Sequence, residues 1–155
     1  MTPAINAAQK NKVIHYIHEY NHDTTSESYG DEAAQKLGIS TERVFKTLVV
    51  NIDNVTLAVA VIPVSAMLSM KLMAKVYGAK KATMAMKKDV ERSTGYVLGG
   101  VSPLGQKKRL STFIDASAKE FTSIFVSAGK RGVEIELSPQ DLQQLTQAKL
   151  ADLCQ

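Results

Sequence analysis

Cysteine is nearly absent from this sequence: the single one, Cys154, stands one residue before the end of the 155-residue chain. One cysteine cannot form an internal disulfide, and it excludes a metal knuckle made of paired cysteines. A reducing, cytoplasmic setting is therefore expected.

Long apolar segments are missing as well. The N-terminal stretch MTPAINAAQKNK lacks the apolar core of a secretory signal, and the longest charge-free run, residues 54–70, is broken by Pro63 and several polar residues. We therefore expect a protein that is neither secreted nor membrane-spanning.

No linker, internal repeat or low-complexity segment interrupts the chain, so residues 1–155 are expected to form a single domain. Hydrophobic residues make up 45% and charged residues 22%, which is ordinary for a globular protein. The net charge is +4, with cations concentrated at residues 71–88 and 107–109. This balance permits a polyanionic partner without requiring one.

Periodicity and capping residues predict a set of helices and strands. The helices are expected at residues 3–20, 31–38, 66–78, 87–95 and 139–150, and the strands at 24–29, 81–85, 112–115, 123–127 and 133–137. Residues 43–63 form two apolar, β-branched runs around a turn at 51–54, which indicates a central hairpin. Because hairpin-joined strands are interspersed with helices, the predicted fold class is α+β (mixed α/β), with a mixed, largely antiparallel sheet.

The segment HEYNH at residues 18–22 matches the HExxH pattern of zinc proteases. On the predicted first helix, however, Val13, Ile17 and Tyr20 define the apolar face, and the histidines point the opposite way, toward solvent. No third ligand is suggested downstream, so we expect no metal here.

The segment SAGKRG at residues 127–132 is similar to a phosphate-binding loop only in part. Such a loop needs a glycine five residues before Gly129 and a serine or threonine after the lysine, where Ile124 and Arg131 stand. A tight turn with two exposed cations is the simplest interpretation. A backbone contact to a ligand from Ser127 to Gly129 stays open.

Lys46 is the most informative single residue. It is the only charged residue between Arg43 and Asp53, in a strand with apolar neighbours on both faces. Burying an unpaired ammonium is costly, so this side chain must reach solvent, find an anion or line a pocket. It is either a lysine that extends to solvent from an edge strand or a fixed cation that holds a phosphate or a carbonyl oxygen.

The stretch GYVLGGVSPLG at residues 95–105 is rich in glycine around Ser102. It lacks the flanks of a nucleophile elbow, because Leu104 stands where the second glycine belongs. Gly99 and Gly100 allow a close approach of backbone to a ligand, so successive N–H groups can converge on an oxyanion or a phosphate. A purely structural turn is the alternative.

Taken together, the lysine in RVFKTLVV and the later LGGVSPLGQKKRL resemble the YbaK/ProX family of trans-editing aminoacyl-tRNA deacylases, most closely its Cys-tRNA(Pro) deacylases. The resemblance covers essentially the whole chain, including TPAI at the start, VIPV at the end of the hairpin and SAGKRGVEIEL. Its strength lies in the order and spacing of these segments.

This resemblance implies a curved, barrel-like mixed sheet surrounded by helices that form a pocket for the 3′ end of a mischarged tRNA. Lys46, Gly100 and Val101 would be the catalytic residues, with Lys46 anchoring and polarising the ester and the glycine loop facing the aminoacyl carbonyl. The substrate-binding residues that it implies are Tyr20, Tyr29, Thr47, Gly99, Ser102, Pro103, Ser127 and Gly129.

The family resemblance also implies a reaction without cofactor or metal, in which the substrate's cysteine thiol attacks its own carbonyl. The substrate would be Cys-tRNA(Pro), together with Cys-tRNA(Cys), and prolyl-tRNA synthetase would be a partner. Lys107 to Arg109 are expected either to contact tRNA or to form a solvated turn. The alternatives are a deacylase for another mischarged tRNA such as Ala-tRNA(Pro), or a non-catalytic module that binds a nucleotide or an RNA end.

Overall fold

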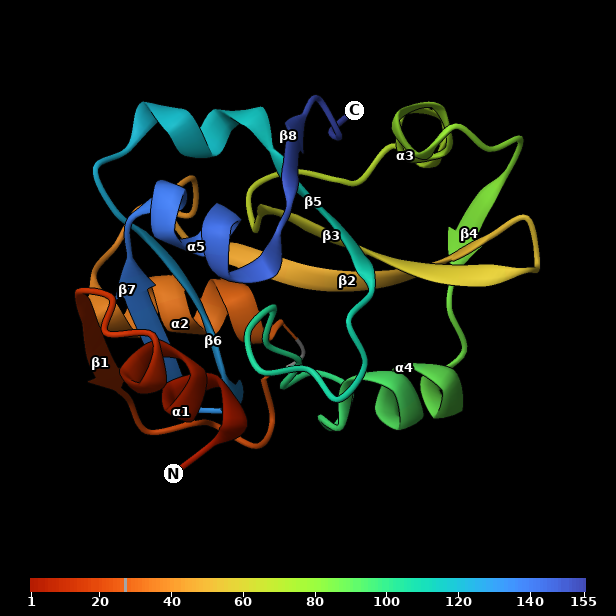
Figure 1. The fold of residues 1–155 in the computed structure, drawn as a ribbon. Coiled ribbons are helices and arrows are strands. Elements are labelled where there is room, and N and C mark those ends of the chain that lie inside the picture. Colours follow the sequence, from red (N-terminus) through yellow and green to blue (C-terminus); the bar gives the residue numbers. More distant parts are fainter. Residues whose placement is uncertain (27) are drawn as a thin grey trace.

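The strands fall into two sheets, which Figure 1 shows side by side in a computed structural model that describes residues 1–26 and 28–155. One sheet has three strands in the order β1-β7-β6, and the other has five in the order β4-β2-β3-β5-β8. In chain order the elements are α1 (Pro3–Lys10), β1 (His15–Glu19), α2 (Tyr29–Leu37), β2 (Phe45–Ile52), β3 (Thr56–Pro63), α3 (Met70–Tyr77), β4 (Ala82–Met84), α4 (Lys87–Thr94), β5 (Ser111–Asp115), the short 3-10 helix η1 (Ala116–Glu120), β6 (Ile124–Lys130), β7 (Val133–Leu137), α5 (Pro139–Thr146) and β8 (Lys149–Ala151).

The predicted α+β class is confirmed, and most strand pairs are antiparallel as expected. The exceptions are β3 with β5 and β5 with β8, which run parallel. The sheets do not close into a barrel. The described chain contains no helix that is both long and apolar enough to cross a bilayer.

The predicted central hairpin is confirmed as β2 and β3, whose residues pair from Phe45 with Pro63 to Ile52 with Thr56. Its two faces belong to two different cores. Val49 and Val59 pack with α4 and the three-stranded sheet, whereas Val50 and Ala58 pack with α3. Both faces are apolar because helices α3 and α4 cover opposite sides of this hairpin (Figure 1).

Several helix ends lie where their capping residues predict. Gly38, Gly78 and Gly95 each end a helix in the left-handed conformation that glycine tolerates. Ser138 caps α5, its hydroxyl accepting a hydrogen bond from the Asp141 N–H at 3.1 Å, and Pro139 is the first helical residue.

The predicted helix at residues 3–20 is wrong. Helix α1 ends at Lys10, Lys12 has a positive φ of 56°, and residues 15–19 form strand β1, which pairs with β7. The segment VIHYIHEY at residues 13–20 is rich in β-branched and aromatic side chains, which fit the edge of a sheet better than the interior of a helix.

The strand predicted at residues 24–29 is also wrong: Tyr29 begins helix α2, and residue 27 lies outside the described residues. Helix α3 begins at Met70 with Ser69 as its cap, later than the predicted start at residue 66. Helix α5 stops at Thr146, after which β8 adds a strand that was not predicted.

Candidate functional site

A pocket of about 350 Å³ opens between the beginning of α2, strand β2, helix α4 with the loop after it, and the β6–β7 hairpin. These elements come from four separate parts of the chain. Its walls are formed by Tyr20, Ser28, Tyr29, Gly30, Val44 to Val49, Met84, Ala85, Val90, Leu98, Gly99, Val101, Ser127, Lys130, Arg131 and Glu134.

Strand β2 contributes its edge to this pocket. Val44 forms an isolated bridge with Phe125, and β4 pairs with β2 only from Val50 onward. Between these two points no described strand pairs with the second edge of β2, and all residues from Val44 to Val49 line the pocket.

Lys46 lies on this free edge and lines the pocket, in agreement with one of the positions its sequence context allows. No carboxylate of the described residues lies within ion-pair distance of it. The hydroxyl of the neighbouring Thr47 is buried and has no hydrogen-bond partner in the described chain. Both groups are therefore available to a ligand.

The glycine loop after α4 forms the wall beside Tyr29. Gly99 has a φ of 93°, and a Cβ added there would lie 2.5 Å from the Tyr29 ring, so both conformation and space require glycine. The Gly100 N–H is donated to the Val97 carbonyl at 2.8 Å, and the Leu98 N–H to Glu91 at 2.9 Å. The N–H groups of Gly99 and Val101 form no hydrogen bond within the described part of the chain.

The structure brings together most of the residues predicted for the site. Tyr20, Tyr29, Lys46, Thr47, Gly99, Val101 and Ser127 all line the pocket. Gly100, Ser102, Pro103 and Gly129 do not.

The residues outside the pocket have local structural contacts. Ser102 is fully buried and its hydroxyl accepts from the Leu104 N–H, while Pro103 lines a second cavity. A Cβ on Gly129 would lie 2.3 Å from the Tyr96 ring. These contacts place Ser102 and Gly129 behind the pocket wall.

Arg131 is a pocket residue to which the sequence assigned no specific role. Its guanidinium lies 3.9 Å from the centre of the Tyr29 ring and donates to the Leu98 carbonyl at 3.3 Å. It thus joins α2, the glycine loop and the β6–β7 hairpin at the pocket mouth. The predicted turn at residues 127–132 is shorter than expected, because β6 continues to Lys130 with an irregular register after Ser127.

Glu134 is a second pocket residue that the sequence did not indicate. In VEIEL, Glu134 and Glu136 share one face of the strand, a pattern that suggests two exposed carboxylates. Instead Glu134 is only 7% exposed and accepts no hydrogen bond from a described residue. Burial raises its pKa to about 8, so it is neutral at pH 7.

Tyr20 shares this environment. Burial, followed by the nearby carboxyl group of Glu134, raises the pKa of Tyr20 to about 12. Its phenol is therefore protonated at any physiological pH, and it serves as a hydrogen-bonding group rather than as an anion.

The HExxH segment lies in a different environment from the predicted one. His18 belongs to strand β1 and its Nε2 lies 2.9 Å from Glu136, while the Nδ1 of His22 lies 2.7 Å from Glu32. The expected orientation toward solvent is wrong, since both rings are partly buried against carboxylates. Within the described residues there is no cluster of three metal-ligating side chains.

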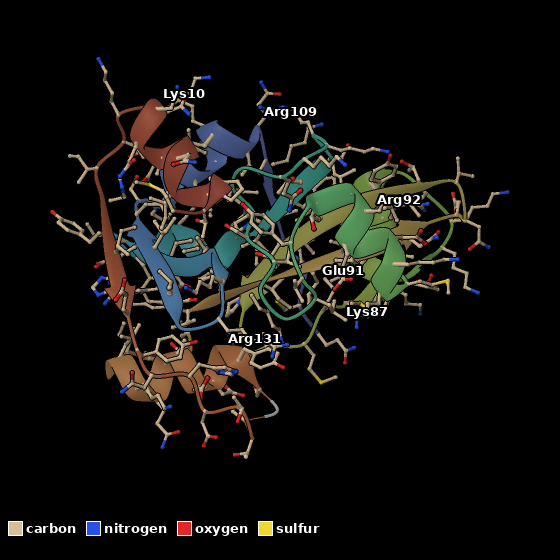
Figure 2. All side chains as sticks on the ribbon, turned by 90° about the horizontal axis from the view of Figure 1, so that it is seen from below. Lys10, Lys87, Glu91, Arg92, Arg109 and Arg131 are labelled. Atoms are coloured by element: carbon tan, nitrogen blue, oxygen red, sulfur yellow. The ribbon has the colours of Figure 1, made fainter. Side chains whose placement is uncertain are left out.

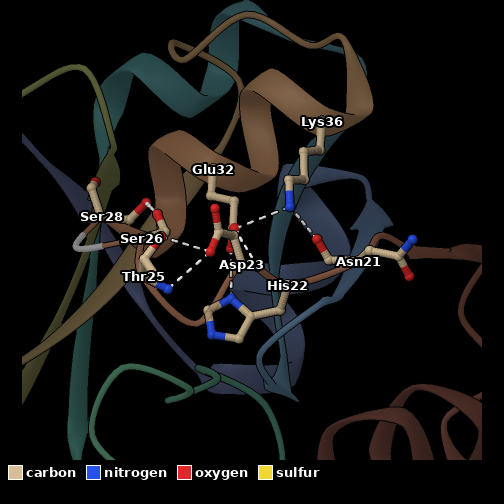
Figure 3. Close-up of polar contacts among 8 residues, drawn as sticks. All are labelled: Asn21, His22, Asp23, Thr25, Ser26, Ser28, Glu32 and Lys36. Atoms are coloured by element: carbon tan, nitrogen blue, oxygen red, sulfur yellow. Dashed lines mark hydrogen bonds and ion pairs between the residues drawn. The ribbon is translucent and has the colours of Figure 1, made fainter.

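His22 belongs instead to a polar cluster around Glu32 (Figure 3). Glu32 accepts from the backbone N–H of Asp23 at 2.7 Å and lies 3.2 Å from the Lys36 Nζ, which also donates to the Asn21 carbonyl. Burial would raise the pKa of Glu32, but the donors outweigh it and lower the pKa. The cluster fixes residues 21–23 to α2 and so positions Tyr29 at the pocket.

The cations at residues 107–109 lie away from the pocket. Lys108 and Arg109 line a second, smaller cavity of about 180 Å³ beside Asn11 at the end of α1. In Figure 2, Lys10 and Arg109 lie near the upper edge of the molecule, apart from Lys87 and Arg131 below the middle of the view. The predicted tRNA contact of Lys107 to Arg109 stays a prediction, at a distance from the pocket.

The chain is a member of the aminoacyl-tRNA editing domain family, whose model matches residues 25–145. The protein is an aminoacyl-tRNA deacylase.

Two individual relatives show which proteins of known sequence the chain is similar to. The chain is 39% identical over 154 residues to a protein of Enterococcus faecalis provisionally named Cys-tRNA(Pro)/Cys-tRNA(Cys) deacylase EbsC, covering 98% of this chain and 92% of that one. It is 30% identical over 131 residues to the uncharacterised YwhH of Bacillus subtilis, covering 84% and 83%.

A crystal structure described as a candidate trans-editing enzyme for prolyl-tRNA synthetase superposes with a TM-score of 0.85 at 21% identity, covering 100% of this chain and 99% of that one. At 21% identity, this structural likeness supports the fold alone.

Proposed function

We propose that the protein removes cysteine from Cys-tRNA(Pro), and from Cys-tRNA(Cys), by positioning the ester so that the cysteine thiol attacks its own carbonyl. One observation carries the proposal: among the described residues no histidine lines the pocket, and the pocket hydroxyl that donates to a carboxylate is that of Ser28, which bonds Asp31 at 2.6 Å at the exposed start of α2. Ser127 accepts from the Gly129 N–H. A substrate that supplies its own nucleophile suits such a site.

Lys46 and the glycine loop supply the electrostatic part of the reaction. The unpaired Lys46 ammonium and the free N–H groups of Gly99 and Val101 can donate to the oxyanion that develops on the carbonyl. Gly100 contributes by closing the turn that presents these groups, because its own N–H is already donated to Val97. The free hydroxyl of Thr47 is a further donor for the bound ester.

The proposed reaction needs no water. A bond forms between the thiol sulfur and the carbonyl carbon, and the bond from that carbon to the 3′ oxygen of the terminal adenosine breaks. The thiol proton ends on that oxygen, so the products are a cyclic thiolactone and a tRNA with a free 3′ hydroxyl. Positioning accounts for most of the rate, since the attack is intramolecular.

A deacylation assay with mass analysis of the released product tests this proposal. Cys-tRNA(Pro), Cys-tRNA(Cys) and Ala-tRNA(Pro) are compared, and we expect cleavage of the two cysteinyl substrates with release of thiolactone, which is one water lighter than cysteine. Lys46→Ala is expected to lower kcat/KM by about 100-fold, as removal of an oxyanion donor typically does. Lys75→Ala, a change of an exposed lysine on α3, is the matched control.

Two results contradict the proposal. Equal cleavage of Ala-tRNA(Pro) would show that water attacks, which favours the broader deacylase. Binding of all three charged tRNAs without turnover would indicate a non-catalytic RNA-end module.

We also propose that prolyl-tRNA synthetase delivers the substrate. The observation that supports this is the modest positive charge of the chain, +4, which is small for tight binding of a whole tRNA. Addition of the synthetase should lower KM for Cys-tRNA(Pro) and leave Cys-tRNA(Cys) unaffected. An unchanged KM would indicate that the enzyme selects its tRNA alone.

A further inference from the structure

Exposed apolar side chains gather at the mouth of the pocket. Met84, which is 51% exposed, and Leu98, which is 44% exposed, line the pocket. Met86, which is 63% exposed, lies two residues after Met84, and Val97, which is 67% exposed, directly precedes Leu98; these two do not line the pocket themselves. We call these four residues the mouth patch. Such a concentration of exposed apolar side chains beside a binding pocket marks a surface that contacts a partner.

Cations surround the mouth patch. Lys87 and Lys88 form the first turn of α4 directly after Met86, and Lys130 and Arg131 lie on the pocket's other side. Figure 2 shows Lys87 and Arg131 on the same side of the molecule, with Glu91 near them. No described carboxylate lies within ion-pair distance of these four cations.

The nearby acids are already engaged. Asp89 pairs with Arg92 at 2.6 Å, and Glu91 accepts the Leu98 N–H at 2.9 Å. Glu91 keeps its negative charge, but the four cations at the mouth outnumber it, so the net charge there is positive and complements a phosphate backbone.

Arg131 adds a flat surface to the mouth. Its guanidinium stacks on the Tyr29 ring and the side chain is exposed. An arginine plane held in this way is a good support for a nucleobase.

We propose that the mouth patch, with Lys87, Lys88 and Arg131, holds the single-stranded nucleotides that precede the terminal adenosine of the tRNA substrate. The proposal rests on the proposed function, because the ester inside the pocket must be joined to RNA that leaves through this mouth. Bases then lie against the apolar side chains of the patch, and the lysines meet phosphates. Stacking and charge without base-specific contacts would give a grip that tolerates different tRNAs.

The first experiment measures binding, by fluorescence anisotropy, of an uncharged acceptor-stem minihelix with a single-stranded NCCA end. The double variant Met86→Ser/Val97→Ser is expected to weaken binding about tenfold, because it replaces two aliphatic side chains that bases would cover with polar ones. Ile14→Ser, at an exposed apolar residue before β1 and outside the pocket, is the matched control with unchanged affinity.

The double variant should keep its fold. Met86 is the N-cap of α4 and makes no side-chain capping hydrogen bond, so serine there should stabilise the helix. A loss of RNA affinity together with an unchanged or higher melting temperature therefore reports on the patch.

The salt dependence of RNA binding tests whether Lys87 and Lys88 contact phosphates. Lys87→Ala/Lys88→Ala should reduce the slope of log affinity against log salt by about 0.7 for each phosphate that the two lysines neutralise in the wild type. A blunt minihelix without the NCCA end should bind the wild type more weakly, and the patch variants should cause no further loss.

Kinetics separate this proposal from the proposed function. On 3′-cysteinyl-adenosine, which lacks the preceding nucleotides, Met86→Ser/Val97→Ser should leave kcat/KM unchanged, while KM for the charged minihelix rises about tenfold. If the wild type cleaves neither substrate, the proposed function fails, and the binding assay still decides the patch. The proposal would be overturned if the double variant bound the NCCA minihelix as tightly as the wild type does. It would also be overturned if the double variant lost affinity for prolyl-tRNA synthetase alone.

Discussion

Two buried glutamates near Tyr20 differ in almost everything except their burial. Glu32 is 5% exposed and Glu134 is 7% exposed. Glu32 receives His22, Lys36 and the Asp23 N–H, and its pKa is lowered, whereas Glu134 has no described hydrogen-bond partner and its pKa is raised to about 8.

This contrast shows that burial alone does not decide the charge of a carboxyl group in this fold. A carboxylate with enough donors stays charged and stabilises its surroundings, as Glu32 does for the segment before α2. A buried carboxyl group without donors stays neutral at a cost to stability above its ordinary pKa. That cost is tolerated in the wall of a pocket, where a ligand can supply the missing donor.

Removing the unpaired acid should change stability most. Between the ordinary pKa of 4.5 and about 8, the unfolded chain releases the Glu134 proton while the folded chain retains it, so stability falls as pH rises. At about 1.4 kcal/mol per pKa unit, Glu134→Gln should stabilise the protein at pH 9 by on the order of 5 kcal/mol and have little effect at about pH 4.5.

Urea unfolding followed by far-UV circular dichroism at both pH values measures this change. Glu136→Gln is the matched control, two residues along the same strand. Ser123, His18 and Arg43 contact Glu136 and contribute to its lowered pKa, so its replacement should not stabilise at alkaline pH. If the stability of Glu134→Gln depended on pH in the same way as that of the wild type, the contrast between Glu134 and Glu32 would be contradicted.

Removing the paired acid should have the opposite sign. Glu32→Gln leaves His22, Lys36 and the Asp23 N–H without their anion, and we expect a loss of about 3 kcal/mol at pH 7. Because the folded pKa of Glu32 is lowered, its contribution is present above 4.5 and is lost as pH falls through the folded value. The free energy of unfolding of the variant should therefore fall less than that of the wild type as pH drops below 4.5. An equal fall in both proteins would show that the cluster does not hold Glu32 charged.

A smaller loss of stability is expected when Lys36, at the exposed edge of the polar cluster around Glu32, is replaced. The Lys36 side chain is about one-third exposed, so its ion pair with Glu32 is partly screened. Lys36→Met should cost under about 1 kcal/mol in urea unfolding. Lys75→Met on α3 is the control, and a loss as large as that of Glu32→Gln would make Lys36 the main donor.

Much of the fold could be predicted from local residues. The β2–β3 hairpin follows from its two apolar runs, and the helix ends at Gly38, Gly78 and Gly95 follow from the conformation that glycine allows. The errors at residues 11–20 have a different origin. There, pairing of β1 with β7, more than a hundred residues away, decides the structure.

The pocket residues also differ in whether local sequence or long-range packing determines their position. Lys46 was predictable because a lone cation in an apolar strand has few acceptable positions, and Gly99 because a tight loop requires it. Arg131 was not distinguishable from an exposed turn cation, since its contact with Tyr29 depends on how α2 packs against the β6–β7 hairpin.

Neighbours in the chain were enough to specify the apolar hairpin, the glycine-ended helices and the lysine with its glycine loop, because each depends on residues close together in the sequence. The burial of Glu134 without a described hydrogen-bond partner was settled by packing between distant segments. Donors reach Glu32 from the segment just before its own helix, whereas Glu134 faces a pocket that is enclosed by four distant segments and offers it none among the described residues. Charge state in a buried site depends on these long-range neighbours, which composition and periodicity do not specify.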